Sequence, residues 1–291
     1  MRHPGYLVRK MSARYGTITL PSGTRMPALG LGTWRMGERQ AARSREVAAL
    51  RLGLDLGVSM IDTAEMYGDG EAEAIVGEAI AGRRERVFVV SKVYPHNATR
   101  RGTIAACKRS LKRLRSDHLD LYLLHWRGDV PLAETIAGME TLMSEGAIRA
   151  WGVSNFDRAD LEQLLSLPGS EACAANQVLY HLGARGVEWD LLPFCRSRRI
   201  AVMAYSPLDQ GRLLASRALA AVAQRLEATP AQVAIAWLLA QHGVAVIPKA
   251  VNATHVHDNV SAANLQLDDA ALAALSHAFP PPARATSLRM L

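Results

Sequence analysis

Short apolar runs and amphipathic stretches alternate along this chain of 291 residues. The apolar runs are rich in β-branched residues and predict eight strands, at Leu29–Gly32, Met60–Asp62, Val87–Lys92, Leu119–His125, Ile148–Ser154, Ala174–Val178, Ile200–Ser206 and Val244–Pro248. The amphipathic stretches have a helical period, among them Ser44–Leu56, Ala72–Ala81, Arg101–Arg115, Pro131–Ser144, Arg158–Leu167 and Pro230–Ala240. This alternation indicates an α/β protein with a parallel sheet, and eight repeats predict a closed (β/α)8 TIM barrel.

The two ends of the chain depart from this alternation. Residues 16–32 hold two β-rich runs around the turn signal Pro21-Ser22-Gly23, which predicts a hairpin that plugs the bottom of the barrel. Residues 1–14 are basic and lack the apolar core of a secretory signal, so we expect a disordered N-terminal arm. The tail is irregular from about residue 279. We therefore expect a single barrel domain over residues 15–291.

Composition points to a cytoplasmic protein. Hydrophobic residues make up 49% of the chain, but no apolar run approaches the roughly 18 residues that span a bilayer, so we expect no membrane partner. The three cysteines, Cys107, Cys173 and Cys195, form no C-x-x-C pair, which argues against both disulfides and a zinc site.

The net charge of +7 raises the question of a nucleic-acid partner. The 34 Lys and Arg residues are almost all arginines and are spread along the chain. The densest groups, Arg83-Arg84-x-Arg86 and Arg196-x-Arg198-Arg199, follow helical stretches, so we expect solvated helix ends that complement the helix dipole. Aromatic residues make up only 5% of the chain and leave no platform for stacking bases. We expect no nucleic-acid partner.

Polar side chains stand where most of the predicted strands end. They are Asp62, Lys92, His125, Ser154 with Asn155, Gln177, Tyr205 with Ser206, and Lys249. The first ends follow one another at about 30 residues, the length of one strand–helix unit. A barrel brings these ends to one rim, its C-terminal face, where barrel enzymes have their active sites. Each residue alone has an ordinary structural explanation, but their recurrence at successive strand ends does not.

The residues at this rim favour proton transfer over other chemistries. There is no G-x-S-x-G or H-E-x-x-H motif, and Lys92 would pair with Asp62 rather than leave it to act with Glu65 as a glycosidase pair. A cation about 4 Å from a phenol contributes about 4 kcal/mol at an effective dielectric near 20, or roughly three pKa units. Lys92 would thereby lower the pKa of Tyr67 and make it a general acid. Asp62 would hold Lys92, and His125 would orient the substrate oxygen or share in the proton transfer. Glu65 is left as a loop residue.

Taken together, these motifs resemble the aldo-keto reductase superfamily over about residues 16–264. The matching stretches are GLGTW (Gly30–Trp34), IDTAEMYG (Ile61–Gly68), VSK (Val90–Lys92), LDLYLLHW (Leu119–Trp126), WGVSNF (Trp151–Phe156), Asn176-Gln177, YSPL (Tyr205–Leu208) and IPKA (Ile247–Ala250). In detail the chain is most similar to bacterial methylglyoxal-reductase-type members. No G-x-G-x-x-G fingerprint is present, which agrees with a dinucleotide bound over a barrel rim rather than in a Rossmann fold.

The resemblance implies that NADPH reduces a carbonyl substrate and that Tyr67, Asp62, Lys92 and His125 are the catalytic residues. It implies cofactor contacts at Gly32, Thr33, Trp34, Asp62, Ser154, Asn155, Gln177, Tyr205, Ser206, Leu208, Lys249, His255, Asp258 and Asn259. It also implies an apolar substrate pocket formed by Trp34, Tyr67 and Trp126.

His255 marks a departure from the family pattern. Many members that prefer NADPH have an arginine here, which stacks on adenine and pairs with the 2′-phosphate. A neutral imidazole makes at most one hydrogen bond to that phosphate, whereas an arginine makes two. Lys249 still offers a cation. We therefore predict a preference for NADPH with reduced discrimination against NADH.

Two rival functions remain open at the level of the sequence. One is a redox-sensing barrel, like the potassium-channel β subunits that share this fold, which binds NADPH but turns over little. The other is a barrel hydrolase or isomerase, which binds no nicotinamide. We expect a small carbonyl compound as the partner of this protein, and a monomer or a weak homo-oligomer.

Overall fold

The computed structural model describes residues 15–291, so the predicted disordered arm at residues 1–14 lies outside the described residues. Its main sheet has eight parallel strands in chain order: β3 (Leu31–Gly32), β4 (Met60–Asp62), β5 (Phe88–Val93), β6 (Leu121–Leu124), β7 (Trp151–Ser154), β8 (Cys173–Leu179), β9 (Ala201–Tyr205) and β10 (Val244–Val246). Each lies within one of the predicted apolar runs or extends it by one residue at one or both ends. The strands of the predicted barrel are therefore confirmed.

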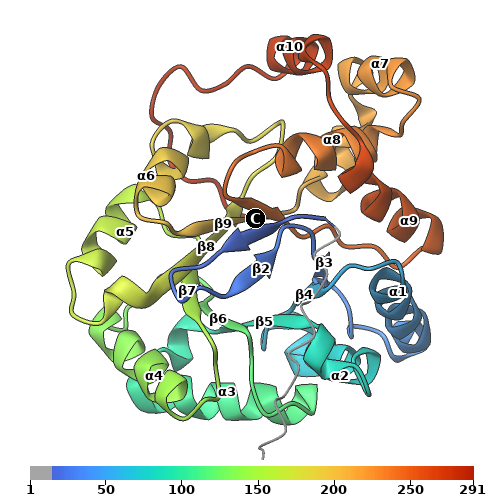
Figure 1. Ribbon diagram of the computed structural model, residues 1–291. Helices are drawn as coiled ribbons and strands as arrows, with labels where there is room; N and C mark the ends of the chain where they lie inside the picture. Colours follow the sequence, from blue (N-terminus) through green and yellow to red (C-terminus); the bar gives the residue numbers. More distant parts are fainter. Residues whose placement is uncertain (1–14) are drawn as a thin grey trace, which may run out of the picture.

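The first and last strands meet, which closes the sheet. Leu29, just before β3, pairs in parallel with Val246 of β10. Gly30 donates its N–H to the carbonyl of Val246 at 2.9 Å, and Val246 donates in turn to Ala28 at 2.8 Å. Figure 1 shows the resulting ring, with the sheet inside and the helices around it. The predicted (β/α)8 barrel is confirmed.

Helices α1 to α8 lie between successive strands, and α9 and α10 follow the last strand. They are α1 (Arg43–Asp55), α2 (Glu71–Ala79), α3 (Arg100–Leu114), α4 (Leu132–Ser144), α5 (Arg158–Leu165), α6 (Leu191–Ser197), α7 (Arg217–Arg225), α8 (Pro230–Leu239), α9 (Ala253–Ser261) and α10 (Asp269–Ala278). Short 3-10 helices lie between them, at η1 (Gln40–Ala42), η2 (Tyr67–Gly70), η3 (Arg84–Arg86), η4 (Pro95–Asn97), η5 (Ser170–Ala172), η6 (Gly186–Glu188), η7 (Asp209–Ala215) and η8 (Ala262–Asn264). The six predicted helices all form. The sequence pattern did not single out α6, α7, α9 and α10, which have only seven to ten residues each.

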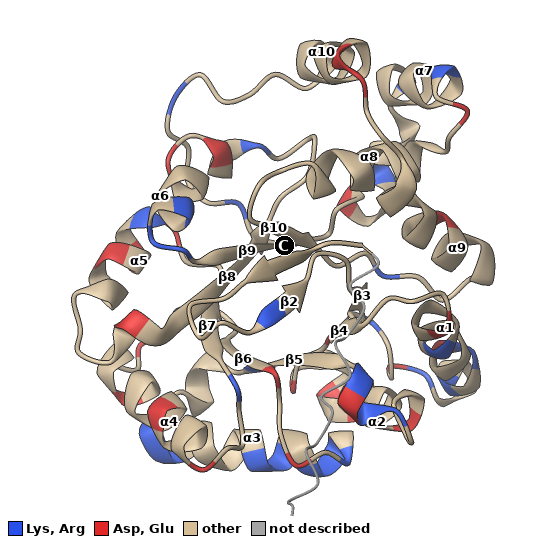
Figure 2. Cartoon of the chain, viewed as in Figure 1, with Lys and Arg blue, Asp and Glu red and all other residues tan. Residues whose placement is uncertain are grey.

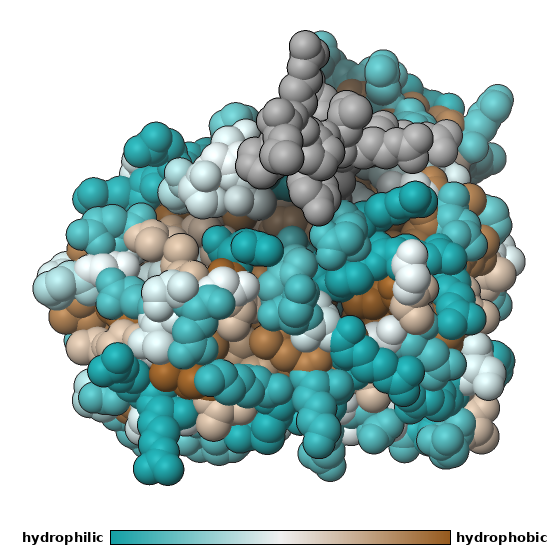
Figure 3. Space-filling model, turned by 60° about the horizontal axis from the view of Figure 1, so that its bottom comes forward, coloured by the Kyte–Doolittle hydropathy of each residue, from teal (hydrophilic) through white to brown (hydrophobic). Residues whose placement is uncertain are grey.

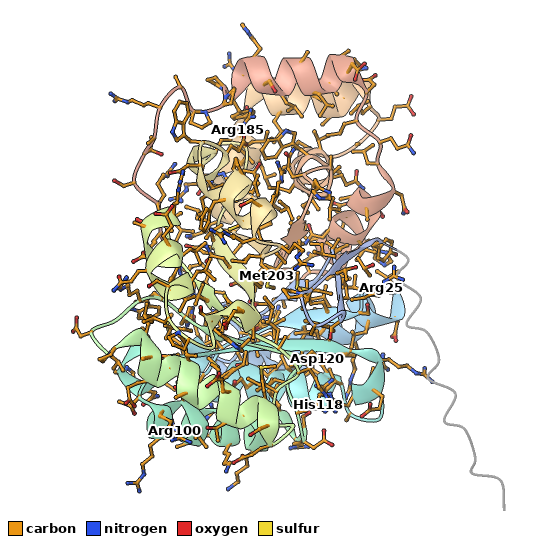
Figure 4. All side chains as sticks on the ribbon, turned by 60° about the vertical axis from the view of Figure 1, so that its left-hand side comes forward. Arg25, Arg100, His118, Asp120, Arg185 and Met203 are labelled. Carbon is orange, nitrogen blue, oxygen red and sulfur yellow. The ribbon has the colours of Figure 1, made fainter. Side chains whose placement is uncertain are left out.

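The predicted hairpin forms and closes one end of the barrel. Its strands β1 (Thr17–Thr19) and β2 (Arg25–Pro27) are antiparallel, and Gly23 in the turn has a φ of +82°. Leu20 and Met26 are buried in one apolar cluster with side chains from inside the barrel, among them Met60, Phe88 and Met203. In Figure 1 the hairpin crosses the near mouth of the barrel, and in Figure 4 Met203 lies in the middle of the molecule. The plug therefore leaves only the opposite mouth available for a site.

Arg84, which belongs to one of the dense arginine groups, is not the solvated cation that the sequence predicted at a helix end. The side chain of Arg84 is only 14% exposed, pairs with Asp120 at 2.9 Å, and also donates to the backbone carbonyls of Val87 and His118. Asp120 and His118 lie close together in Figure 4. The prediction of a solvated helix end is therefore wrong for Arg84, because its guanidinium joins the starts of two strands. Elsewhere in the described part, Lys and Arg mix with Asp and Glu around the ring of helices (Figure 2).

The outer surface is mostly hydrophilic where α2, α3 and α4 come forward, with smaller hydrophobic areas between the polar side chains (Figure 3). Within residues 15–291, no helix is both long and apolar enough to cross a membrane. The tail after α10 has no regular structure, as predicted, and in Figure 1 it runs past α6, with the C-terminus marked at the middle of the view.

Candidate active site

A cavity of about 200 Å³ opens among the carboxyl ends of the barrel strands. It is lined by Gly32, Thr33, Trp34, Asp62, Met66, Tyr67, His125, Trp126, Ser154, Asn155, Gln177, Tyr205, Ser206, Pro207, Ile247, Lys249, Met290 and Leu291. These residues come from β3, β4, β7, β8 and β9, from the loops that follow the strands, and from the tail. The rim predicted from the strand ends is thus a single concave surface.

Lys92 and Asp62 form a buried ion pair beneath this cavity. The Nζ of Lys92 lies 2.8 Å from Oδ2 of Asp62, and their side chains are 0% and 3% exposed. Lys92 also donates to the backbone carbonyl of Thr63 at 2.8 Å. Burial lowers the pKa of Lys92, while Asp62 acts in the opposite direction by attracting the ammonium. The carboxylate therefore holds a cation in place that burial alone would disfavour.

Tyr67 reaches over the same pair from the loop after β4. Its hydroxyl lies 3.3 Å from Nζ of Lys92, and the ammonium is 4.9 Å from the centre of its ring. The chain then turns sharply through Gly68, Asp69 and Gly70, all with positive φ, before α2 begins. A Cβ on Gly68 would come within 2.9 Å of the backbone oxygen of Met36, so this turn requires glycine.

The expected lowering of the Tyr67 pKa is not what the structure gives. Burial raises the pKa of Tyr67 well above its ordinary value of 10, and the carboxylate of Asp62 raises it further. The sequence argument counted the Lys92 cation but not the loss of water around the phenol. Tyr67 is therefore protonated at neutral pH and has a proton to give, while Lys92 is placed to stabilise the phenolate that remains afterwards.

His125 stands beside Tyr67 as a neutral ring. The two rings make an edge-to-face contact at 5.7 Å, and His125 also packs against Trp126 at 4.9 Å. Burial, and then the positive charge of Lys92, lower the pKa of His125 from 6.5 to about 2. A neutral imidazole can orient a substrate oxygen, but at neutral pH it is not an acid. Of the two roles predicted for His125, the structure favours orientation.

Amide and hydroxyl groups form the opposite wall of the cavity. Gln177 donates to Oδ1 of Asp62 at 2.7 Å, which ties this wall to the ion pair. Ser154 donates to the backbone carbonyl of Gln177, and Asn155 to that of His125. The hydroxyl of Tyr205 donates to Oδ1 of Asn155 at 2.9 Å. Polar groups that can bind an amide thus lie next to the flat ring of Tyr205.

Most of the predicted site residues meet at this cavity, but Lys92 lies beneath it and four others do not line it. Leu208, His255, Asp258 and Asn259 lie outside the cavity, the last three on α9. His255 is exposed and Asn259 is buried. Lys249 lines the edge of the cavity, and burial lowers its pKa. The four residues stay candidates for the distant end of a long cofactor.

Five lining residues were not among the predicted set. Met66 and Pro207 sit next to predicted residues within recognisable motifs, so their proximity was a usable signal. Ile247 belongs to the IPKA stretch. Met290 and Leu291 have no local signal, because the tail reaches the cavity only through its path across the molecule.

The arrangement suits reduction of a carbonyl group. It holds a neutral phenol that can donate a proton, a cation next to that phenol, and a neutral imidazole beside both. An amide-binding wall and an aromatic platform lie a short distance away.

Comparison with known proteins agrees with this chemistry. A family model described as "Aldo/keto reductase family" matches residues 28–278. The chain is 52% identical over 271 residues to methylglyoxal reductase YeaE of Escherichia coli, covering 91% of this chain and 95% of that protein. It is 36% identical to glyoxal reductase of Bacillus subtilis, with 86% and 88% covered.

Solved structures extend the likeness to three dimensions. An aldo-keto reductase from Klebsiella pneumoniae in complex with NADPH superposes with a TM-score of 0.92 at 49% identity, covering 95% of this chain and 99% of that one.

Proposed function

Because this chain belongs to the aldo/keto reductase family, we propose that it uses NADPH to reduce aldehydes and ketoaldehydes such as methylglyoxal. The observation that carries this proposal is the buried contact of Tyr67 with Lys92, which is itself paired with Asp62. The similar E. coli and B. subtilis proteins are named for the reduction of methylglyoxal and glyoxal, which supports a small dicarbonyl substrate.

The residues of the cavity fit a nicotinamide. The Tyr205 ring supplies a flat surface for stacking, and Ser154, Asn155 and Gln177 supply groups that can bind a carboxamide. The hydrogen bond from the Tyr205 hydroxyl to Asn155 fixes the aromatic ring relative to the side-chain amide of Asn155. NADPH bound there would supply the hydride. Trp34 and Trp126 would form the apolar side of the substrate pocket.

The chain's own residues would then handle the proton. Tyr67 donates its phenolic proton to the carbonyl oxygen as that oxygen gains charge, and Lys92 stabilises the resulting phenolate. Asp62 keeps Lys92 charged and in place. His125, neutral because of its lowered pKa, orients the carbonyl oxygen.

The cofactor preference rests on residues beyond the cavity. A similar structure was solved with NADPH, which supports this cofactor. The exposed His255 on α9 replaces the usual arginine, so NADH is expected to be a weaker but usable donor. Steady-state kcat/KM with both cofactors tests this, and a ratio that favours NADH contradicts it.

Tyr67→Phe tests the proposed function directly. The variant should bind NADPH as the wild type does, measured by quenching of tryptophan fluorescence, and should lose turnover of methylglyoxal by roughly 10²–10⁴-fold, the usual contribution of a general acid. A near-normal rate removes Tyr67 from this role. A wild type that binds NADPH but turns over no carbonyl substrate would instead support the redox-sensing barrel.

The cytoplasmic location and the oligomeric state stay predictions.

A further inference from the structure

Glu65 lies between two catalytic candidates in the chain, three residues after Asp62 and two before Tyr67. The sequence pattern left it as a loop residue. The structure instead buries its carboxylate, with only 7% of the side chain exposed. A buried carboxylate is costly unless it is fully paired, so its partners indicate what it does.

The partners of Glu65 all belong to the next strand–helix unit. Its Oε1 accepts hydrogen bonds from the backbone N–H of Tyr94 at 2.8 Å and from the side-chain amide of Asn97 at 3.0 Å. Its Oε2 lies 3.4 Å from Nη2 of Arg109 on α3. Since the side chain of Arg109 is about half exposed, this ion pair is the weak contact. The two shorter bonds fix the carboxylate.

These bonds continue the pairing of β4 with β5 beyond the end of β4. Thr63 donates its N–H to Val90 at 2.9 Å, and Glu65 donates its N–H to Lys92 at 3.4 Å. After Glu65 the backbone turns helical, since Met66 has φ −69° and ψ −32°. No extended backbone of the β4 segment then lies opposite Tyr94. The carboxylate of Glu65 accepts the hydrogen bond from the backbone N–H of Tyr94 instead. A backbone N–H buried without a partner is rare and costly.

Tyr94 packs against two residues that line the cavity, Trp126 and His125. Its ring lies 5.6 Å from that of Trp126, edge to face, and 6.4 Å from that of His125. Glu65 therefore joins the loop that carries the acid to the loop whose aromatic side chain packs against His125 and Trp126.

We propose that Glu65 is a positioning residue, whose hydrogen bond to the backbone of Tyr94 fixes Tyr67 relative to His125 and Trp126. The inference deepens the proposed function and rests on it. Proton transfer is sensitive to such placement, because a shift of about 1 Å in a reacting group can cost on the order of 10²-fold in rate.

Two substitutions separate the hydrogen bond from the charge. Glu65→Gln keeps an acceptor at the same reach but removes the charge that faces Arg109. Glu65→Asp keeps the charge but draws the acceptor back by one methylene. We expect Glu65→Gln to retain kcat for methylglyoxal within about threefold, and Glu65→Asp to lose roughly 10- to 100-fold in kcat.

The readouts distinguish positioning from loss of folded protein. The rate is expressed per NADPH-binding site, titrated by fluorescence, so unfolded molecules do not count. In Glu65→Asp the Kd for NADPH should stay within twofold of the wild type, and the solvent deuterium isotope effect on kcat should rise as the proton transfer becomes slower. Asn97→Ala, which removes only the second donor, should lower kcat by about two- to fivefold in the same way. It serves as the test variant if Glu65→Asp does not fold.

Three results would overturn the inference: wild-type kcat in Glu65→Asp, an equal loss in both Glu65 variants, or an unchanged isotope effect. Either of the first two results would show that the position of the Glu65 acceptor oxygen does not affect kcat. The third would show that the substitution did not slow the proton transfer. If the wild type reduces no carbonyl substrate, the proposed function fails instead. Glu78→Ala, which removes a partly exposed carboxylate that pairs with Arg43 on the outside of α2, away from the cavity, is the control and should leave kcat unchanged.

Discussion

His125 shows how strongly the surroundings of one side chain can change its chemistry. An ordinary histidine is partly protonated near neutral pH, and from the sequence either orientation or proton transfer was open to it. In the structure it is 7% exposed and close to the Lys92 cation, which together lower its pKa to about 2. Within the described residues, its buried Nδ1 has no hydrogen-bond partner. The folded protein therefore keeps this ring neutral.

The lowered pKa of His125 predicts a loss of stability in acid. Because the folded-state pKa lies below the unfolded value of 6.5, the unfolded chain binds the proton first. The stability is complete above pH 6.5 and falls as the pH drops from there toward about 2. At pH 5 the free energy of unfolding should be about 2 kcal/mol smaller on account of this residue.

Urea unfolding of the wild type and His125→Asn at pH 7 and pH 5 measures this contribution. The variant should lose about 2 kcal/mol less than the wild type between the two pH values. The pKa of His181 is also lowered by burial, but His181 is present in both proteins and cancels in the comparison. Equal losses would show that His125 does not titrate in this way.

The pKa of Tyr67 likewise depends on the immediate surroundings of one side chain. The pattern of the sequence correctly paired a tyrosine with a lysine, yet it gave the wrong direction for the pKa. The motif indicated that Tyr67 lies close to Lys92, but it did not indicate how deeply the phenol is buried. Burial dominates because the phenolate loses more solvation than one cation restores.

At the scale of elements, the hairpin β1–β2 was predictable because its signal is local. Two β-rich runs around a Pro-Ser-Gly turn specify it, whatever the rest of the chain does. Its register then places Leu20 and Met26 in the barrel and leaves Arg25 outside, where it bonds to Thr17 (Figure 4). The hairpin thus fills one mouth of the barrel with apolar side chains.

Met26→Ala should destabilise the protein without changing catalysis. Met26 is fully buried, and removing a side chain of this kind costs about 2–5 kcal/mol in the free energy of unfolding. Because the hairpin lies at the opposite end from the cavity, kcat for methylglyoxal should be unchanged. Urea unfolding and steady-state rates test both statements, with Arg25→Ala on the same strand as the control. A loss below 1 kcal/mol would mean that the hairpin is not an essential part of the core.

The helices that the sequence pattern missed are also an element-scale result. α6, α7, α9 and α10 are short, and α6 contains Pro193 within its seven residues. Helices of this length gain little from local propensity, so packing against the barrel decides whether they form. Length alone does not separate them from the predicted helices, since α5 and α2 have only eight and nine residues.

At the scale of the whole molecule, the tail brings the end of the chain to the site. Arg185 donates to the carbonyl of Phe279, and Arg289 donates to that of Gly183 at 3.1 Å, so the tail is held along the loop after β8. Met290 and Leu291 then line the cavity, each about half exposed. Met290 and Leu291, at the end of the chain, thus line the same cavity as Trp34, which lies near its beginning.

Met290→Ala should therefore alter substrate preference. Half-burying a methionine side chain against a bound apolar group contributes about 1 kcal/mol, equivalent to roughly fivefold. We expect kcat/KM for an aromatic aldehyde to fall by about that factor, and kcat/KM for the smaller methylglyoxal to change by less than twofold. Leu214→Ala, an exposed leucine outside the cavity, is the control. A uniform change for both substrates would count against a role of the tail in selection.

The sequence by itself determined the order of the strands, six of the helices, the hairpin, and the polar residues at most strand ends, because these depend on local period and turn chemistry. Eight strands closed in chain order then bring Asp62, Lys92 and His125 to one rim. Only the tertiary structure decided the rest: the burial that sets the pKa of Tyr67 and His125, the partners of Glu65 on the next strand–helix unit, and the arrival of Met290 and Leu291 at the cavity. These features depend on distances and on exclusion of water between segments far apart in the chain, which no local pattern records.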